Sequence, residues 1–228
     1  LTADLTRDTQ RTKAMAMIGS TIGLTFALSL VASPWLNQLI GVPGIFALTG
    51  VLSLLAIGVV GFVVPAATVV KPHGAAEGTG FLQLLGDPQL ARLNFGIFAL
   101  HAVLMALFIV VPLELRDGGL AVDHHWQVYL PVMLGSFVLM VPAILLAERR
   151  GRSKEVFTGS VAVLLAGHLA MPWLLGSTSS IVLFLLVFFS AFNVLEAMLP
   201  SLTSKLAPPA AKGAAMGIYS SIQFLGTD

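Results

Sequence analysis

Long uncharged stretches, separated by short clusters of charged residues, dominate the sequence. The stretch between Lys13 and Lys71 contains 57 uncharged residues, and the stretch between Glu155 and Glu196 contains 40. Two shorter stretches, 93–113 and 126–147, contain 21 and 22 residues without Lys, Arg, Asp or Glu. A helix needs about 20 largely apolar residues to cross the hydrocarbon layer of a membrane. The two long stretches therefore predict two spans each, and the shorter stretches predict one each.

Turn-forming residues divide the two long stretches. Asn37, Gln38 and Gly41 interrupt the first, and a Gly, Ser and Thr cluster at 176–180 interrupts the second. The runs lack the period-two alternation of barrel strands, and a helix satisfies every backbone polar group within lipid. The expected fold is an all-α polytopic membrane protein with spans at residues 14–36, 43–64, 93–113, 126–147, 156–174 and 181–203.

The distribution of basic residues supports this division. If the loops are assigned alternately to the two sides of the membrane, one side receives 11 of the 12 Lys and Arg residues and the other receives only Arg116. Lys and Arg accumulate in the cytoplasmic loops of membrane proteins. We therefore expect both ends of the chain to lie in the cytoplasm.

Composition excludes several classes of protein. Hydrophobic residues make up 57% of the chain and charged residues 10%, whereas a soluble domain has about 25% charged residues. The net charge of +1 gives no indication of a nucleic-acid partner. The absence of cysteine excludes disulfides and thiolate metal sites, and the sequence has no G-x-x-x-x-G-K-[ST] motif for binding the phosphates of ATP. We expect no cofactor and no metal.

The two ends of the sequence and a weak internal repeat indicate a fragment. The chain starts at Leu1, and the apolar segment 213–226 ends at Asp228 before it is long enough to cross. Residues 13–26 and 213–226 share four identities at an offset of 200. Parallel copies of a helix bundle are typical of transporters built from two six-helix halves. We therefore expect an internal fragment of a longer membrane protein.

Four stretches carry a family resemblance: residues 4–30, 42–65, 145–157 and 195–226. They resemble the major facilitator superfamily, and nearly the whole chain is similar to its YajR-like bacterial branch of proton-driven, drug-type transporters. The resemblance implies a fragment of the two-bundle (6+6 helix) fold. In that fold, 1–64 would be helices 5 and 6 of the N-terminal bundle, 65–92 the central cytoplasmic linker, and 93–228 helices 7 to 10 with the start of helix 11.

The resemblance also implies a function. It suggests a secondary active transporter, not an enzyme, that moves a small molecule across the bacterial cytoplasmic (inner) membrane by alternating access, with proton-coupled efflux. The expected partners are a small-molecule substrate, protons and the lipid bilayer, and the full-length protein would be a monomer. The glycine-proline element of antiporters is represented only by Ser33 and Pro34, which gives weak support for antiport.

A basic loop follows the fourth predicted helix and resembles the superfamily's signature. Its members are Glu148, Arg149, Gly151, Arg152 and Lys154. In the family, an acidic residue near the inner end of helix 10 pairs with arginines of this loop and closes the cytoplasmic gate. The resemblance therefore predicts a gating pair of Glu196 with Arg149 or Arg152. Direct proton or substrate binding by Glu196, or a purely structural pair, are the alternatives.

Two histidines, His101 and His168, lie inside predicted spans. Histidine changes charge near neutral pH, as proton coupling requires. His101 shares a helix face with Asn94, and Glu196 shares one with Asn193, so these positions are candidates for a cavity or for proton coupling. Packing through hydrogen bonds is the alternative for both histidines. A third hypothesis is a non-transport membrane protein in which His101 and His168 bind haem.

Overall fold

The structure is a computed structural model that describes residues 11–63 and 80–227. All regular elements of the described residues are helical, which confirms the predicted all-α class. In chain order they are α2 (Arg11–Phe62), α3 (Phe81–Gly86), α4 (Pro88–Asp117), the short 3-10 helix η1 (Val122–His124), α5 (Trp126–Arg149), α6 (Ser153–Leu174), α7 (Thr178–Leu206), η2 (Pro209–Ala211) and α8 (Lys212–Leu225).

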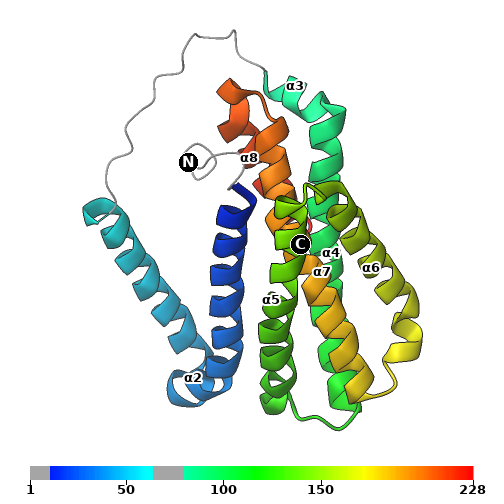
Figure 1. Ribbon diagram of the computed structural model, residues 1–228. Coiled ribbons are helices and arrows are strands. Elements are labelled where there is room, and N and C mark those ends of the chain that lie inside the picture. The colour runs from blue at the N-terminus through cyan, green and yellow to red at the C-terminus, as the bar shows by residue number, and fades with distance from the viewer. Residues whose placement is uncertain (1–10, 64–79, 228) are drawn as a thin grey trace.

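Helix α2 consists of two limbs that meet at Gly41. This residue has a φ of 63° and a ψ of 176°, a conformation that glycine adopts because it has no Cβ. The two limbs run in opposite directions from this turn (Figure 1). They correspond to the predicted spans 14–36 and 43–64, up to the last described residue at 63.

Five stretches of the described residues are long and apolar enough to cross a membrane. The first passes through the Gly41 turn and so draws on both limbs of α2, and the others match the four later predicted spans. Two of these helices begin before their predicted limits at polar N-caps: Asp87 accepts hydrogen bonds from the first backbone N–H groups of α4, and Ser177 accepts one from the backbone N–H of Ser180 in α7. The stretches are Val31–Phe62, Pro88–Asp117, Val122–Arg149, Ser153–Leu174 and Thr178–Leu206.

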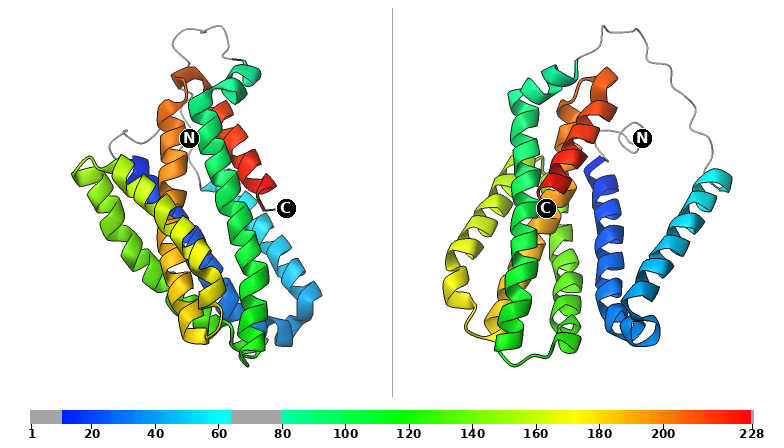
Figure 2. Two further views of the ribbon diagram at one scale, coloured as in Figure 1. Left: turned by 90° about the vertical axis from the view of Figure 1, so that its right-hand side faces the viewer. Right: turned by 180° about the vertical axis from the view of Figure 1, so that it is seen from behind.

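Helix α7 is the centre of the bundle. In its most apolar stretch 61% of residues are buried, more than in any other candidate span of the described chain. Helices α5 and α6 pack on one side of α7, and α4 and α8 pack on another (Figure 2). The first limb of α2 lies along α5 and α7, with Gly23 against the ring of Phe137. Side chains from α4, α7 and α8 can therefore meet in one place.

The predicted linker, 65–92, is described only from residue 80 onward. This part forms α3 and the first residues of α4, so the helix begins inside the predicted linker. Leu84 of α3 is 2% exposed and packs with Leu90, Ala207 and Ala215. The short helix α3 is therefore attached to the ends of α4, α7 and α8 by apolar contacts.

Candidate functional site

Three polar side chains meet where α4, α7 and α8 lie side by side (Figure 2). Nε2 of Gln223, on α8, lies 2.9 Å from Nε2 of His101 on α4 and 3.2 Å from Oε1 of Glu196 on α7. Nε2 of His101 lies 4.0 Å from Oε2 of Glu196. One glutamine thus bridges an imidazole and a carboxylate inside the helix bundle.

The backbone of α4 determines which nitrogen of His101 carries the proton. Nδ1 lies 3.2 Å from the carbonyl oxygen of Ile97, one turn earlier. Only an Nδ1–H group can donate to that oxygen, so the neutral imidazole presents the lone pair of Nε2 to Gln223. The ring also contacts Phe192, with centroids 5.8 Å apart. Because Phe192 and Glu196 are one turn apart on α7, they face α4 together.

Burial separates the two ionisable groups of this site from bulk water. His101 is 8% exposed. The side chain of Glu196 is 27% exposed, but its Oε2 atom is buried and has no hydrogen-bond partner. A charge in such a place is costly unless it has a partner, and ionisable groups inside membrane-spanning helices usually mark a functional site.

The basic loop forms a tight connection between α5 and α6. The carboxylate oxygens of Glu148 are buried. Gly151 has a φ of 63°, and this conformation turns the chain before α6 begins at Ser153. Nε of Arg152 lies 3.6 Å from Oε1 of Glu155, and both side chains are more than half exposed. Exposed pairs of this kind contribute under about 1 kcal/mol. Arg149 and Lys154 are exposed as well.

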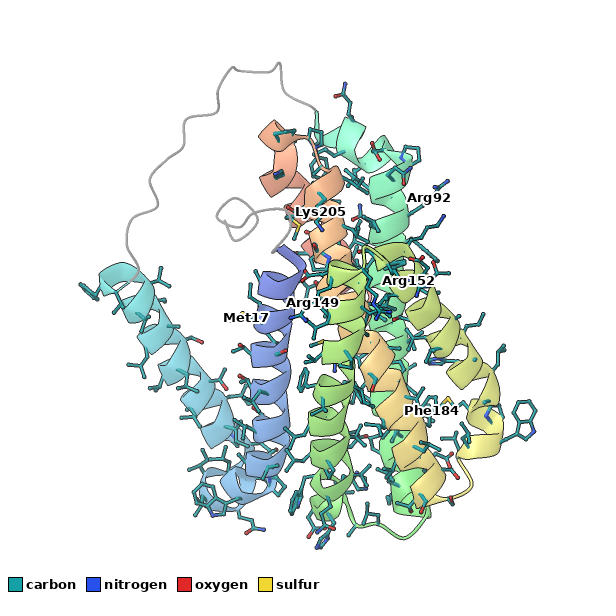
Figure 3. The ribbon with its side chains drawn as sticks, viewed as in Figure 1. Met17, Arg92, Arg149, Arg152, Phe184 and Lys205 are labelled. Carbon is teal, nitrogen blue, oxygen red and sulfur yellow. The ribbon has the colours of Figure 1, made fainter. Side chains whose placement is uncertain are left out.

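Basic side chains gather at one end of the bundle. Arg92, Arg149, Arg152 and Lys205 all lie toward this end, whereas Phe184 lies in the other half (Figure 3). We call it the basic end. The grouping agrees with the sequence-based assignment of these residues to one side of the membrane.

The predicted gating pair is not formed in this conformation. Among the described residues, Glu196 contacts Gln223 and His101, and neither Arg149 nor Arg152. The reason is the direction of its helix face: the α7 residues that pack against α5 and its end are Val194, Ala197 and Met198. Glu196 faces α4 and α8 instead.

The two asparagines differ in their contacts. Nδ2 of Asn193 donates to Oγ of Ser136 on α5 at 2.9 Å, and that hydroxyl donates to the carbonyl of Met133. Asn193 therefore ties α7 to α5 and does not join the Glu196 cluster. Asn94 is 5% exposed, and its Oδ1 has no hydrogen-bond partner.

His168 lies in an aromatic cluster on the other side of α7. Its Nδ1 is 2.7 Å from the carbonyl oxygen of Leu164, and its ring meets Phe184 and Phe188 edge-on at 5.9 and 5.7 Å. The Phe188 ring contacts Phe192, which in turn contacts His101. Two phenylalanine rings thus stand between the histidines, so this arrangement does not place both imidazoles on one haem. His168 has the surroundings of a packing residue.

A cavity of about 690 Å³ lies at the end opposite the basic end. It opens between the turn of α2 and the ends of α4 and α5, and its polar and aromatic lining includes Asn37, Gln38, Trp126 and Tyr129. The hydroxyl of Tyr129 is buried and has no hydrogen-bond partner. The cavity lies between the α2 hairpin and the rest of the bundle at this end, and its mostly apolar lining includes the polar side chains of Asn37 and Gln38.

Sequence analysis missed Gln223 and Ser136. Both are uncharged, and each matters only because a helix distant in sequence brings a partner to it: 122 residues separate His101 from Gln223, and 57 separate Ser136 from Asn193. Gln223 shares a face of α8 with Tyr219, one turn away. Two polar residues on one face of an otherwise apolar segment could have identified Gln223 as a candidate from the sequence.

Comparison with known proteins identifies the family. The family model described as "Major Facilitator Superfamily" matches residues 1–227. The chain is 39% identical over 229 residues to "Inner membrane transport protein YajR" of Escherichia coli (strain K12), covering 99% of this chain and 50% of that protein. It is 27% identical over 227 residues to "Uncharacterized transporter BU466" of Buchnera aphidicola subsp. Acyrthosiphon pisum (strain APS), covering 98% and 58%. The chain thus spans about half the length of the curated relatives it matches. It belongs to the major facilitator superfamily, a family of membrane transporters and not of enzymes.

Proposed function

We propose that the chain is part of a proton-coupled secondary transporter of a bacterial inner membrane, in which His101 and Glu196 bind the coupling proton. The observation that carries this proposal is the buried contact of an imidazole, a carboxylate and an amide between three helices. Imidazole changes charge near neutral pH. A carboxylate oxygen 4.0 Å away provides the counter-charge that a proton on His101 needs.

The whole transporter consists of two helix bundles joined by a linker. Residues 1–64 form the last two helices of the first bundle, residues 65–92 form the linker, and residues 93–228 form most of the second bundle. The two bundles rock around a central site, and the protein exports a small molecule as a monomer in exchange for protons. The cavity between the α2 hairpin and the ends of α4 and α5 supports a conformation that is open at the end opposite the basic end. Glu148 and the exposed basic residues of the α5–α6 loop belong to the gate at the basic end.

The orientation can be tested with single cysteines, because the 228 residues contain none. Ser153 and Ser179 are both exposed and lie at the first turns of α6 and α7, on opposite ends of the bundle. In intact cells, an impermeant thiol reagent should label a Ser179→Cys variant and leave a Ser153→Cys variant unlabelled until the cells are opened. The reverse pattern would place the basic end outside.

Proton binding can be tested without a known substrate. Liposomes that contain the complete transporter are adsorbed on a solid-supported electrode, and a jump in pH is applied. The wild type should give a transient current as protons bind in the membrane. Glu196→Gln and His101→Gln should each reduce this current to the level of empty liposomes, because each removes half of the site. His168→Gln is the matched control and should keep the wild-type current. Equal currents in all four proteins would refute the proposed site.

A further inference from the structure

The amide of Gln223 is held by two acceptors. Its nitrogen lies 2.9 Å from Nε2 of His101, which carries a lone pair, and 3.2 Å from Oε1 of Glu196. An amide nitrogen has two hydrogens, so it can donate one bond to each acceptor. The inverted amide would place its oxygen against a lone pair and a carboxylate oxygen. Neutral His101 together with ionised Glu196 therefore accepts only one orientation of Gln223.

A proton on His101 removes one of these acceptors. The incoming proton binds Nε2, because Nδ1 already carries the hydrogen that bonds to Ile97. The new Nε2–H group has no lone pair left for the Gln223 N–H. A free acceptor is available in Oε2 of Glu196, which is buried, has no hydrogen-bond partner and lies 4.0 Å away. The oxygen of Gln223 is a poorer choice, since turning it toward His101 also turns it toward Glu196.

The other end of the described part of α8 has different contacts. Ala215 and Ile218 of α8 pack in an apolar cluster with Ala211, the residue before the helix, and with Leu84, Leu90 and Ala207. These contacts do not depend on protonation. Among the described residues of α7 and α8, Tyr219 is a further titratable group near the pair, and its hydroxyl lies within electrostatic range of Glu196 and has no hydrogen-bond partner. No Lys or Arg of the described residues forms an ion pair with Glu196.

We propose that Gln223 is a proton-controlled latch that ties α8 to α4 while His101 is neutral and releases α8 from α4 when His101 binds a proton. The proton comes from solvent and binds His101 Nε2, and the direct His101–Glu196 pair replaces the contact between Gln223 and His101. Gln223 keeps its bond to Oε1 of Glu196, and α8 moves away from α4 about its apolar cluster. Gln223 is a positioning residue in this scheme, because it acts through His101 and Glu196. The latch rests on the proposed proton site.

The test measures the position of α8 as a function of pH. Spin labels are attached to the complete transporter through Leu165→Cys on α6 and Ser221→Cys on α8, both at exposed positions, and their distance is measured by double electron–electron resonance. In the wild type the distance should change by about 1–2 Å or more between neutral and acidic buffer, as helix shifts in switching proteins do. In Gln223→Met, which keeps the side-chain length but has no donor, the distance should stay at its acidic value at every pH.

The controls separate the latch from the proton site. Gln127→Met, at an exposed glutamine at the start of α5, should keep the pH-dependent shift. The ¹⁵N resonances of His101 should titrate in the wild type and in Gln223→Met. If His101 titrates and Gln223→Met still shows the wild-type shift in distance, the latch is refuted and the proton site stands. If His101 does not titrate in the wild type, both proposals are refuted.

Discussion

Glu196→Gln should lower the affinity of His101 for a proton about 100-fold. In the wild type the imidazolium would have a carboxylate oxygen 4.0 Å away, and the variant offers only a neutral amide. An uncompensated charge of this kind costs about 3–5 kcal/mol in a buried site, and every 1.4 kcal/mol is about tenfold in an equilibrium. We expect the lower end of that range, because the Glu196 side chain is 27% exposed.

The measurement is the ¹⁵N chemical shift of histidine in the complete transporter across a pH series. His168 is an internal control: it makes the same Nδ1 contact with a carbonyl one turn earlier, but its ring faces Phe184 and Phe188. At pH values where His101 is neutral in both proteins, the resonances of His168 should be the same in both. Glu155→Gln, which removes an exposed acidic residue, should leave His101 unchanged. A His101 that binds its proton equally well in Glu196→Gln would show that Glu196 is not its partner.

Gly226→Ala should displace α8 and destabilise the protein by about 1–3 kcal/mol, the usual cost of overpacking a well-packed site. An added Cβ would lie 2.5 Å from the carbonyl oxygen of Phe98 and 3.2 Å from Cβ of His101. The carbonyl belongs to the backbone of α4 and cannot turn away as a side chain could. Gly226 has a φ of −77°, so the effect comes from contact and not from backbone strain.

Gly217→Ala is the matched control on the same helix, since nothing lies within 4 Å of the added Cβ. It should be neutral or stabilising by up to about 1 kcal/mol, because alanine is the better helix former. Thermal unfolding of the purified transporter compares the two variants, and the pH-jump current reports on the site. Gly226→Ala should lose both stability and current. Equal unfolding temperatures would mean that α8 does not approach α4 as closely as the structure shows.

The helices could be predicted from the sequence because the membrane imposes a simple length rule. The uncharged stretches before Glu114 and Glu148 each give one span, and the structure has α4 and α5 at these places. The Gly41 turn was also predictable, since polar and turn-forming residues interrupt an apolar run there. The helix ends were less predictable, because Asp87 and Ser177 continue α4 and α7 through hydrogen bonds that hydropathy does not register.

The site was only half predictable. Glu196 and His101 are conspicuous as ionisable residues in apolar runs, but the family resemblance assigns Glu196 to an arginine, and the spacing of the residues gives no reason to pair it with His101. The pairing depends on the rotation of α7, which places Ala197 against α5 and Glu196 against α4 and α8. Gln223 carries no charge, so neither hydropathy nor charge counting distinguishes it from an ordinary polar residue.

The row of rings His168, Phe188, Phe192 and His101 crosses the centre of the bundle, with neighbouring centroids 5.7 to 5.8 Å apart. Aromatic rings are rigid, and a close-packed protein interior transmits strain because it is hard to compress. A tilt of the His101 ring would therefore press on Phe192, Phe188 and, through His168, on α6, a helix with no buried residue in the described chain. Proton binding at His101 would then change the packing of α6, whose side chains such as Leu169 and Trp173 are exposed to the surroundings of the protein. In a membrane those surroundings are acyl chains, so the thickness and stiffness of the bilayer should in turn influence how readily the proton binds.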